Sequence, residues 1–422
     1  MNFVDTVMAG RLGQIDLGAV AIGSTIWAAG MLFALGVLMT IPPTVSQLDG
    51  SGRRKQAGEA TRQGLWIALA LSLLMFIGMR SVGLIQHWLD LEPQVAALAL
   101  DYLRAISWGA PAFFMMLVLR FFSEGAGITK PTMYIGVLGI LLNIPLNYAL
   151  MFGNFGLPAL GAVGCGWATA IVYWIQVLAL AGYIRYRDAY QDYGLFSRFS
   201  RPNWLEIGGL LKVGIPIGVM IFFEGSLFVG AALLIGTLGA LPIAAHQVAI
   251  NFASMAFMVP LGLSGAISVR VGNAIGRGEP DAARLAGLVG IGIAVVFGCV
   301  SALVMWVLPT PIARIYTNDA EVIALAAQLL LLAAAFQIAD GIQVAAAGAL
   351  RGMKDTRQPM IYSILSYWMV GMSVGWWLTF RQEWGPQGMW YGMIAGLSVA
   401  AVLMSTRFWR RTGQLLEPIQ SV

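Results

Sequence analysis

Long apolar segments, separated by short polar stretches, follow one another along the whole chain. A helix that crosses the hydrocarbon core of a bilayer needs about 20 mainly apolar residues. Segments of this kind lie at 17–41, 64–86, 96–122, 132–153, 159–184, 209–236, 243–267, 284–308, 322–349, 359–380 and 386–408. The pattern therefore predicts an all-α integral membrane protein with eleven complete spans in this sequence.

The polar stretches carry an uneven charge that orients these spans. Cytoplasmic loops of membrane proteins are enriched in Lys and Arg. When successive loops are assigned alternately to the two sides, twenty Lys and Arg fall on one side and four on the other. The larger set includes 53–62, Arg120 with Lys130, Arg351 and 407–411. We therefore predict that these positions face the cytoplasm.

Composition agrees with a membrane protein and excludes several other classes. Only 11% of the 422 residues are charged and 59% are hydrophobic, whereas soluble domains carry about 25% charged residues. Two cysteines and two histidines are too few for a disulfide framework, a metal-ligand cluster or a Ser/His/Asp triad. A phosphate-binding GxxxxGK[ST] loop is also missing from the sequence. The chain is therefore not expected to be an enzyme or to hydrolyse ATP.

The two halves of the chain resemble each other at a nearly constant offset. Three matches, collinear in the sequence, are offset by 226, 224 and 227 residues. They pair 10–13 with 236–239, 44–53 with 268–277, and 125–130 with 352–357. Such a repeat predicts two lobes of similar fold.

The repeat also bears on the start of the sequence, MNFVDTVMAGRLG. It matches the end of a complete span in the second half, so we expect a first helix that is truncated here and twelve spans in the intact protein. Two six-helix lobes would then insert the same way round, related by a pseudo-two-fold axis along the membrane normal. The predicted boundaries are 1–184 for the first lobe, 185–208 for a cytoplasmic linker, 209–408 for the second lobe and 409–422 for a cytoplasmic tail.

Three acidic residues, Asp5, Glu224 and Asp340, lie inside predicted helices. A charged side chain at the centre of a span costs roughly 2.5–3.5 kcal/mol on insertion scales. These carboxyl groups are either protonated and hydrogen-bonded for structural reasons, or they are sites for a cation or a proton. Three such acids in one apolar chain favour the second interpretation.

Other polar or aromatic residues in the spans are open to two interpretations. Phe228 and Phe336 each lie one helical turn from an acid, where a ring could contact a cation, but ordinary packing is the favoured interpretation. Asn143 and Asn147 share a helical face and could supply oxygen ligands or bond to a neighbouring helix.

Three segments, VDTVMAGRLG, GNAIGRGEPDAAR and FQIADGIQVAAAGALRGMKDTRQP, resemble NorM-type multidrug and toxic compound extrusion (MATE) transporters. The resemblance covers essentially the whole chain. It implies twelve helices in two six-helix lobes around a central cleft, and drug export driven by entry of Na⁺ or H⁺.

The resemblance also implies roles for individual residues. Cation coupling would involve Asp5, Glu224, Asp340, Asn143, Asn147, Phe336 and Thr169. Glu224 and Asp340 would be Na⁺ ligands if sodium is the coupling ion. Drug contacts would involve Ser24, Phe228 and Gln247.

The expected function is a monomeric multidrug efflux antiporter of a bacterial inner membrane that confers antibiotic resistance. It would export organic cations such as drugs, dyes and antimicrobials by alternating access, with no cofactor beyond Na⁺ or H⁺. A flippase for lipid-linked precursors is the alternative, but its pyrophosphate substrate would favour basic residues, and Arg104 is the one plausible example within a span. A receptor or scaffold is a further alternative, for which the sequence offers no partner-binding domain.

Overall fold

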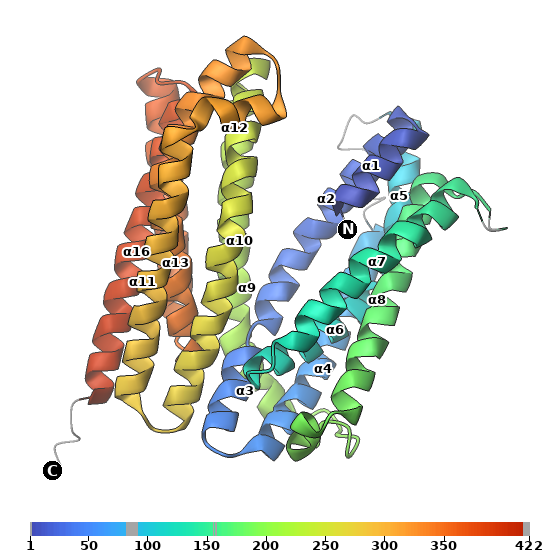
Figure 1. The fold of residues 1–422 in the computed structure, drawn as a ribbon, viewed down its shortest axis with the longest axis vertical. Coiled ribbons are helices and arrows are strands. Elements are labelled where there is room, and N and C mark those ends of the chain that lie inside the picture. The colour runs from blue at the N-terminus through green and yellow to red at the C-terminus, as the bar shows by residue number, and fades with distance from the viewer. Residues whose placement is uncertain (1, 82–91, 155, 157, 417–422) are drawn as a thin grey trace. The chain divides into compact units, whose positions relative to one another are not determined.

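The computed structural model describes the chain except for residues 1, 82–91, 155, 157 and 417–422. Its regular elements are helices, and no strand occurs among the described residues (Figure 1). His87 and the predicted span residues 82–86 lie outside the described part of the chain. The predicted all-α fold is confirmed.

The chain divides into two compact units, and we describe each by itself. The first unit comprises Met1–Ile41 and Arg53–Gly214, and the second comprises Pro42–Gly52 and Ile215–Val422. The first unit contains α1 (Asn2–Leu12), α2 (Gln14–Leu38), α4 (Arg54–Ser81), α5 (Pro93–Ser107), α6 (Ala110–Gly125), α7 (Lys130–Phe152), α8 (Gly161–Tyr186) and the 3₁₀-helix η3 (Asp188–Tyr193).

Helix α9 (Trp204–Gly236) begins in the first unit and continues into the second. The second unit also contains α3 (Ile41–Gly50), α10 (Ala240–Gly276), α11 (Pro280–Val307), α12 (Pro309–Tyr316), α13 (Ala320–Gly352), α14 (Arg357–Ile364), η4 (Leu365–Met372), α15 (Ser373–Trp376), η5 (Trp377–Arg381) and α16 (Pro386–Leu416). Helix α13 is central to this unit, because it packs against α10, α11 and α16.

Each of the eleven predicted spans coincides with helical structure. Among the described residues, nine helices are long and apolar enough to cross a membrane, and a tenth span results if α5 and α6 are counted together. The remaining predicted span, 359–380, falls on the contiguous segments α14 to η5, of which η4 and η5 are π-helical. The chain is a multi-pass membrane protein.

The predicted span 96–122 is not one straight helix, because α5 and α6 meet at an angle of 48°. Gly109 and Pro111 lie at the junction. Proline lacks a backbone N–H and is a common cause of helix kinks. A Cβ at Gly109 would lie 2.9 Å from the Cα of Ala170 in α8, so the break also permits a close approach to α8.

The segment predicted as an interlobe linker, 185–208, groups with the first unit. Arg62 of α4 donates from Nη1 to the carbonyl oxygens of Gly194 and Leu195, at 2.6 and 3.0 Å. It also pairs with Glu59 at 2.6 Å. The segment is therefore held on the end of α4.

Helix α3 groups with the second unit, although it follows α2 directly in sequence. A Cβ at Gly50 would collide with the carbonyl oxygen of Asn273, and a Cβ at Gly276 would collide with that of Gln47. Gln47 also donates from Nε2 to the carbonyl oxygen of Gly352 at 2.8 Å. The repeat segments 44–53 and 268–277 therefore pack directly on each other, backbone against backbone.

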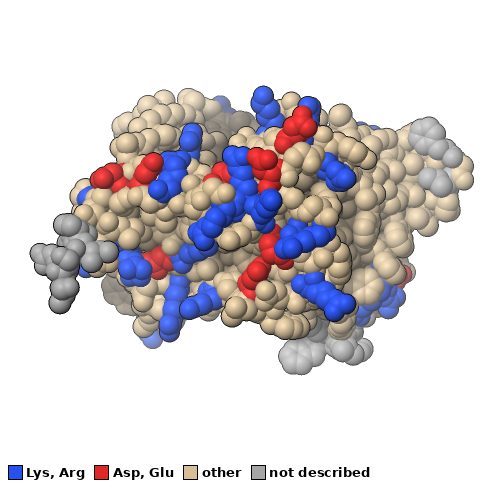
Figure 2. All heavy atoms as spheres, turned by 90° about the horizontal axis from the view of Figure 1, so that it is seen from below, with Lys and Arg blue, Asp and Glu red and all other residues tan. Residues whose placement is uncertain are grey.

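In the second unit the α10–α11 turn, and in the first unit the turn that leads into α4, lie at the lower ends of the helices in Figure 1. Figure 2 shows Lys and Arg at these ends. These turns belong to the loops that the charge bias assigns to the cytoplasm. Arg351 differs, because it is 5% exposed and lies within α13. Its assignment to a cytoplasmic loop was wrong.

The backbone contact of α3 with α10 leads to a test at Gly276. We expect Gly276→Ala to lower thermal stability by about 1–3 kcal/mol, because the new methyl group must displace the backbone at Gln47. Gly265→Ala in the same helix is the matched control. A Cβ there meets nothing within 4 Å, so the change should be neutral or stabilise by up to about 1 kcal/mol. Thermal unfolding of the detergent-purified chain measures both; equal melting temperatures would contradict the close contact.

Candidate functional site

Buried polar side chains form one group in each unit. The first group surrounds Asp5 of α1, which is 4% exposed. Asn147 of α7 donates from Nδ2 to Asp5 Oδ1 at 2.6 Å and to Asn143 Oδ1 at 3.3 Å. Asn143 is bonded to Asn147 and not to Asp5, because its Nδ2 atom has no partner among the described residues. The structure thus brings Asp5, Asn147 and Asn143 together in one chain of contacts.

Oxygen atoms in this group have unused acceptor capacity. Asn147 Oδ1 and the hydroxyl of Thr169 are buried and have no hydrogen-bond partner within the described part of the chain. Such buried atoms call for an explanation, and one is an ion held at the site. Hard cations prefer carboxylate, amide and hydroxyl oxygens. The group therefore has the donor set that a small cation such as Na⁺ requires.

The second group lies where α9 and α13 contribute one acid each. Asp340 of α13 is 2% exposed, and Glu224 of α9 is half-buried. Phe228 and Phe336, each one helical turn from one of these acids, have ring centroids 6.0 Å apart, so the two acids lie on helices that are in contact. Two like charges in a poorly solvated site repel each other, so a cation or a proton that neutralises one of them is stabilised there.

Arg351 is the functional candidate that the sequence did not reveal. It is 5% exposed and lies in the last turn of α13. It also donates from Nη2 to the hydroxyl of Ser264 at 3.4 Å. A buried charge needs a counter-charge. Its position beside Gly352 at the end of α13 made it look like a loop residue.

Two glutamines extend this group along α13. Gln337 and Gln343 lie three residues before and after Asp340, and both are fully buried. Their side-chain nitrogen and oxygen atoms, and Asp340 Oδ1, have no hydrogen-bond partner among the residues that the structure describes. One buried stretch of α13 thus presents a carboxyl group and two amides with unused bonding capacity.

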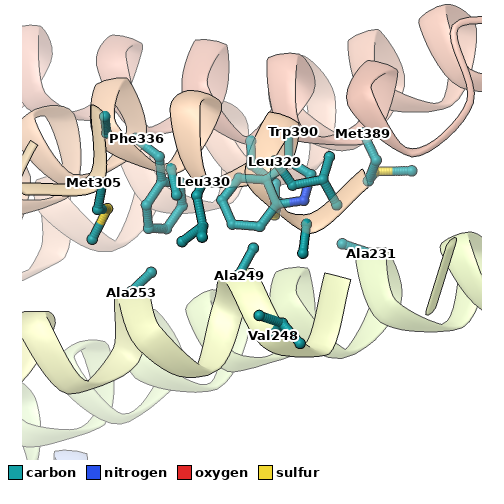
Figure 3. Close-up of a cluster of buried hydrophobic side chains, with 14 of the residues drawn as sticks. Ala231, Val248, Ala249, Ala253, Met305, Leu329, Leu330, Phe336, Met389 and Trp390 are labelled. Carbon is teal, nitrogen blue, oxygen red and sulfur yellow. The ribbon is translucent and has the colours of Figure 1, made fainter. Parts of the chain in front are cut away.

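Phe336 and Phe228 lie in an aromatic cluster next to these acids. The two rings meet edge to face with centroids 6.0 Å apart, and Phe336 makes a similar contact with Trp390 at 5.6 Å. Figure 3 shows Phe336 and Trp390 among aliphatic side chains that include Leu329 and Leu330. Phe336 is 2% exposed, so packing accounts for its contacts in this structure.

The other predicted drug contacts are more exposed. Ser24 of α2 is half-buried, and its hydroxyl donates to the carbonyl oxygen of Ala21 at 3.2 Å. Gln247 of α10 is exposed. Ser24 lies in the first unit, whereas Phe228 and Gln247 lie in the second.

The distribution of ionisable ligands narrows the kind of ion that fits. Over the described residues, no group of three or more His, Cys, Asp or Glu could hold a metal ion. A cation at either group would therefore rely on one or two carboxyl groups supplemented by neutral oxygens. Either group therefore offers few charged ligands to an ion.

Comparisons with known proteins give a consistent result. The MatE family model matches residues 1–149 and 216–377. A probable multidrug resistance protein NorM from Xanthomonas campestris pv. campestris is 44% identical over 416 residues, which cover 99% of this chain and 91% of that protein.

Two solved structures share the fold at low sequence identity. The eukaryotic MATE transporter AtDTX14 is 22% identical with a TM-score of 0.84, covering 98% of this chain and 94% of that one. A transporter of the MOP superfamily from Pyrococcus furiosus is 20% identical with a TM-score of 0.88, covering 99% of this chain and 92% of that one.

The bond between Asn147 and Asp5 can be measured by a double-mutant cycle of Asn147→Ala and Asp5→Ala. We expect a coupling free energy of about 0.5–3 kcal/mol in thermal stability, because each change leaves the other buried group without its partner. Asn154→Ala, near the end of the same helix, is the control in a second cycle with Asp5→Ala and should show no coupling. Additive effects in both cycles would contradict a direct bond.

The packing role of Phe336 can be tested by truncation. We expect Phe336→Ala to destabilise the protein by about 3–5 kcal/mol, because a buried ring is removed from the cluster. Phe222→Ala serves as the control, since that ring is 51% exposed. Thermal unfolding would show a much smaller loss for Phe222→Ala; a similar loss for both would argue against the buried cluster.

Proposed function

Because the chain belongs to the MatE family of membrane transporters, we propose that it is a secondary active exporter of organic cations. In this proposal Na⁺ or H⁺ enters through the chain while a drug, dye or antimicrobial leaves across a bacterial inner membrane. The family makes the protein a transporter and not an enzyme. The printed name of its Xanthomonas relative, a probable multidrug resistance protein, supports drugs as the cargo.

The observation that carries the coupling proposal is that Glu224 and Asp340 lie on two helices, α9 and α13, that contact each other one helical turn from each acid, through the rings of Phe228 and Phe336. Arg351 is buried in the same unit. With both carboxyl groups ionised, these three residues have one net negative charge. One monovalent cation or one proton neutralises that charge. An unbalanced charge is disfavoured in a poorly solvated site. Because this site is neutral only when a cation or a proton is bound, binding of that ion is favoured.

Exchange then follows from linkage between ion and drug. Binding of the ion must weaken binding of the cationic drug, and by reciprocity the drug must weaken binding of the ion. We propose that each is carried in its own direction by a chain that opens alternately to the two sides. The acids supply the charge for which both cations compete.

Membrane voltage limits the stoichiometry. Moving one charge through 100 mV is worth about 2.3 kcal/mol. Exchange of one monovalent drug for one monovalent ion moves no net charge and gains nothing from voltage. Concentrative export therefore needs a chemical gradient of the ion or a second ion, and the Asp5 group is a candidate for the second site.

The test is ethidium efflux from cells that lack other pumps, with sodium and proton gradients imposed separately. We expect one of the gradients to drive efflux, and Asp340→Asn to reduce efflux to the rate of cells without the protein. The control is Glu321→Gln, an exposed acid near the start of the same helix, which should leave efflux unchanged. Membrane extracts must contain equal amounts of folded protein.

Gradient-driven efflux that persists in folded Asp340→Asn would overturn the assignment of this acid to coupling. Folded wild-type protein that moves no cationic dye under either gradient would overturn the proposed function as a whole.

A further inference from the structure

The segment 196–205, which the sequence predicted to belong mostly to a cytoplasmic linker, has large apolar side chains on its surface. Phe199, Trp204 and Leu205 are 80%, 80% and 86% exposed. Phe199 precedes the helix that begins at Trp204, so it lies outside the spans. An exposed apolar surface of this kind calls for a partner that covers it.

The backbone of this segment is held on α4 by hydrogen bonds. Trp66 of α4 donates from Nε1 to the carbonyl oxygen of Ser200 at 3.0 Å. Gln63, one turn earlier, donates from Nε2 to the carbonyl oxygen of Arg201 at 3.1 Å, and its Oε1 accepts from the backbone N–H of Asn203 at 2.9 Å. The exposed side chains are therefore presented by a backbone that is fixed on the first unit.

These bonds place the segment at the height where the spans enter the bilayer. In α4, Gln63 directly precedes the apolar run 64–71. In α9, Trp204 is five residues before the apolar segment 209–236, which is about 8 Å along a helix. The headgroup layer on each side of the hydrocarbon core is about 5–8 Å thick. The segment therefore lies at the height of the headgroups.

The segment also lies on the side of α4 that faces lipid. Leu73 and Ile77 are seven and eleven residues after Trp66, so the three side chains share one face of α4. Leu73 and Ile77 are 59% and 54% exposed within a membrane span. The rings of Phe199 and Trp66 meet edge to face with centroids 5.9 Å apart. Phe199 therefore continues the lipid-facing surface of α4 toward the headgroups.

The charged groups of this surface have a net positive charge. Arg62 and Arg198 both pair with Glu59, at 2.6 and 2.9 Å. Arg201 is exposed, and Glu206 lies in the first turn of α9. Three arginines and two glutamates leave one positive charge. Anionic headgroups attract basic groups that lie next to a span.

We propose that Phe199, Trp204 and Leu205 form an interface anchor that lies in the headgroup layer, and that Arg201 beside them binds an anionic phospholipid. Aromatic side chains are enriched at this depth of the bilayer. The segment 196–205 is then a membrane-surface element and not a solvated linker. The anchor is independent of the exported cargo and of the coupling ion.

The experiment measures the depth of the interface anchor in nanodiscs of phosphatidylcholine that hold the full chain. The fluorophore NBD is attached to Phe199→Cys or, in a second protein, to Leu205→Cys, each combined with Cys299→Ala. Cys165 is fully buried and stays in place. Phosphatidylcholine with a doxyl quencher near the headgroup, or near the end of its acyl chain, is then added. We expect both labels to be quenched more strongly by the lipid with the shallow quencher.

Two positions on α4 calibrate the depth. Gln56→Cys is exposed and ten residues before Trp66, about 15 Å farther from the hydrocarbon core, so neither lipid should quench its label. Leu73→Cys lies within the span, and the deep quencher should act on it more strongly. Labels at Phe199 and Leu205 that behave like the label at Gln56 would overturn the interface anchor and favour a soluble protein as the partner of this surface.

The preference for anionic lipid is measured with the label at Leu205→Cys and the shallow quencher carried by phosphatidylglycerol or by phosphatidylcholine. We expect about fivefold enrichment of phosphatidylglycerol beside the label, the ratio that one basic group near an anionic lipid supports. Arg201→Gln should abolish this enrichment and leave the depth of the label unchanged. Lys55→Gln removes an exposed cation eleven residues before Trp66 and should change neither. Equal quenching by the two lipids without Arg201→Gln, or enrichment that survives it, would overturn the anionic site.

Discussion

The lack of water in the hydrocarbon core is the constraint on which this structure depends. Backbone groups there must bond to one another, which accounts for helices throughout the described spans. Polar side chains face the same constraint, so each one inside a span requires a partner or a ligand. Asp5 has a protein partner in Asn147, whereas Asp340 and its neighbouring glutamines retain unused bonding capacity. The unused bonding capacity around Asp340 suits an ion that binds reversibly.

Hydropathy predicted the fold well because a span needs little more than a long apolar segment. All eleven predicted segments coincide with helices among the described residues, and Glu224 and Asp340 lie within two of them. The sequence could not show the break at Gly109, since a Gly-x-Pro junction is compatible with either a kink or a continuous helix. It also could not show that Arg351 is buried within the second unit, because charge near a predicted helix end does not say which way the side chain faces.

The internal repeat has a structural meaning that sequence comparison alone does not provide. Segments 44–53 and 268–277 match in sequence, and they also pack on each other within the second unit. Small residues let the two backbones touch, as is common where helices approach closely in membranes. Close packing therefore accounts for Gly50 and Gly276, whereas a Cβ at Gly262 or Gly265 in α10 would meet nothing within 4 Å.

The chain passes from one unit to the other more than once along its sequence. The chain crosses from one unit to the other at Ile41–Pro42, at Gly52–Arg53 and at Gly214–Ile215. Each crossing contains a glycine or a proline, and Gly52 has a positive φ of 74°. If the chain were cleaved between residues 185 and 208, α3 would lie on the N-terminal fragment but would still belong to the second unit. The two halves of the sequence are therefore not separable modules, because α3 precedes the linker and belongs to the second unit.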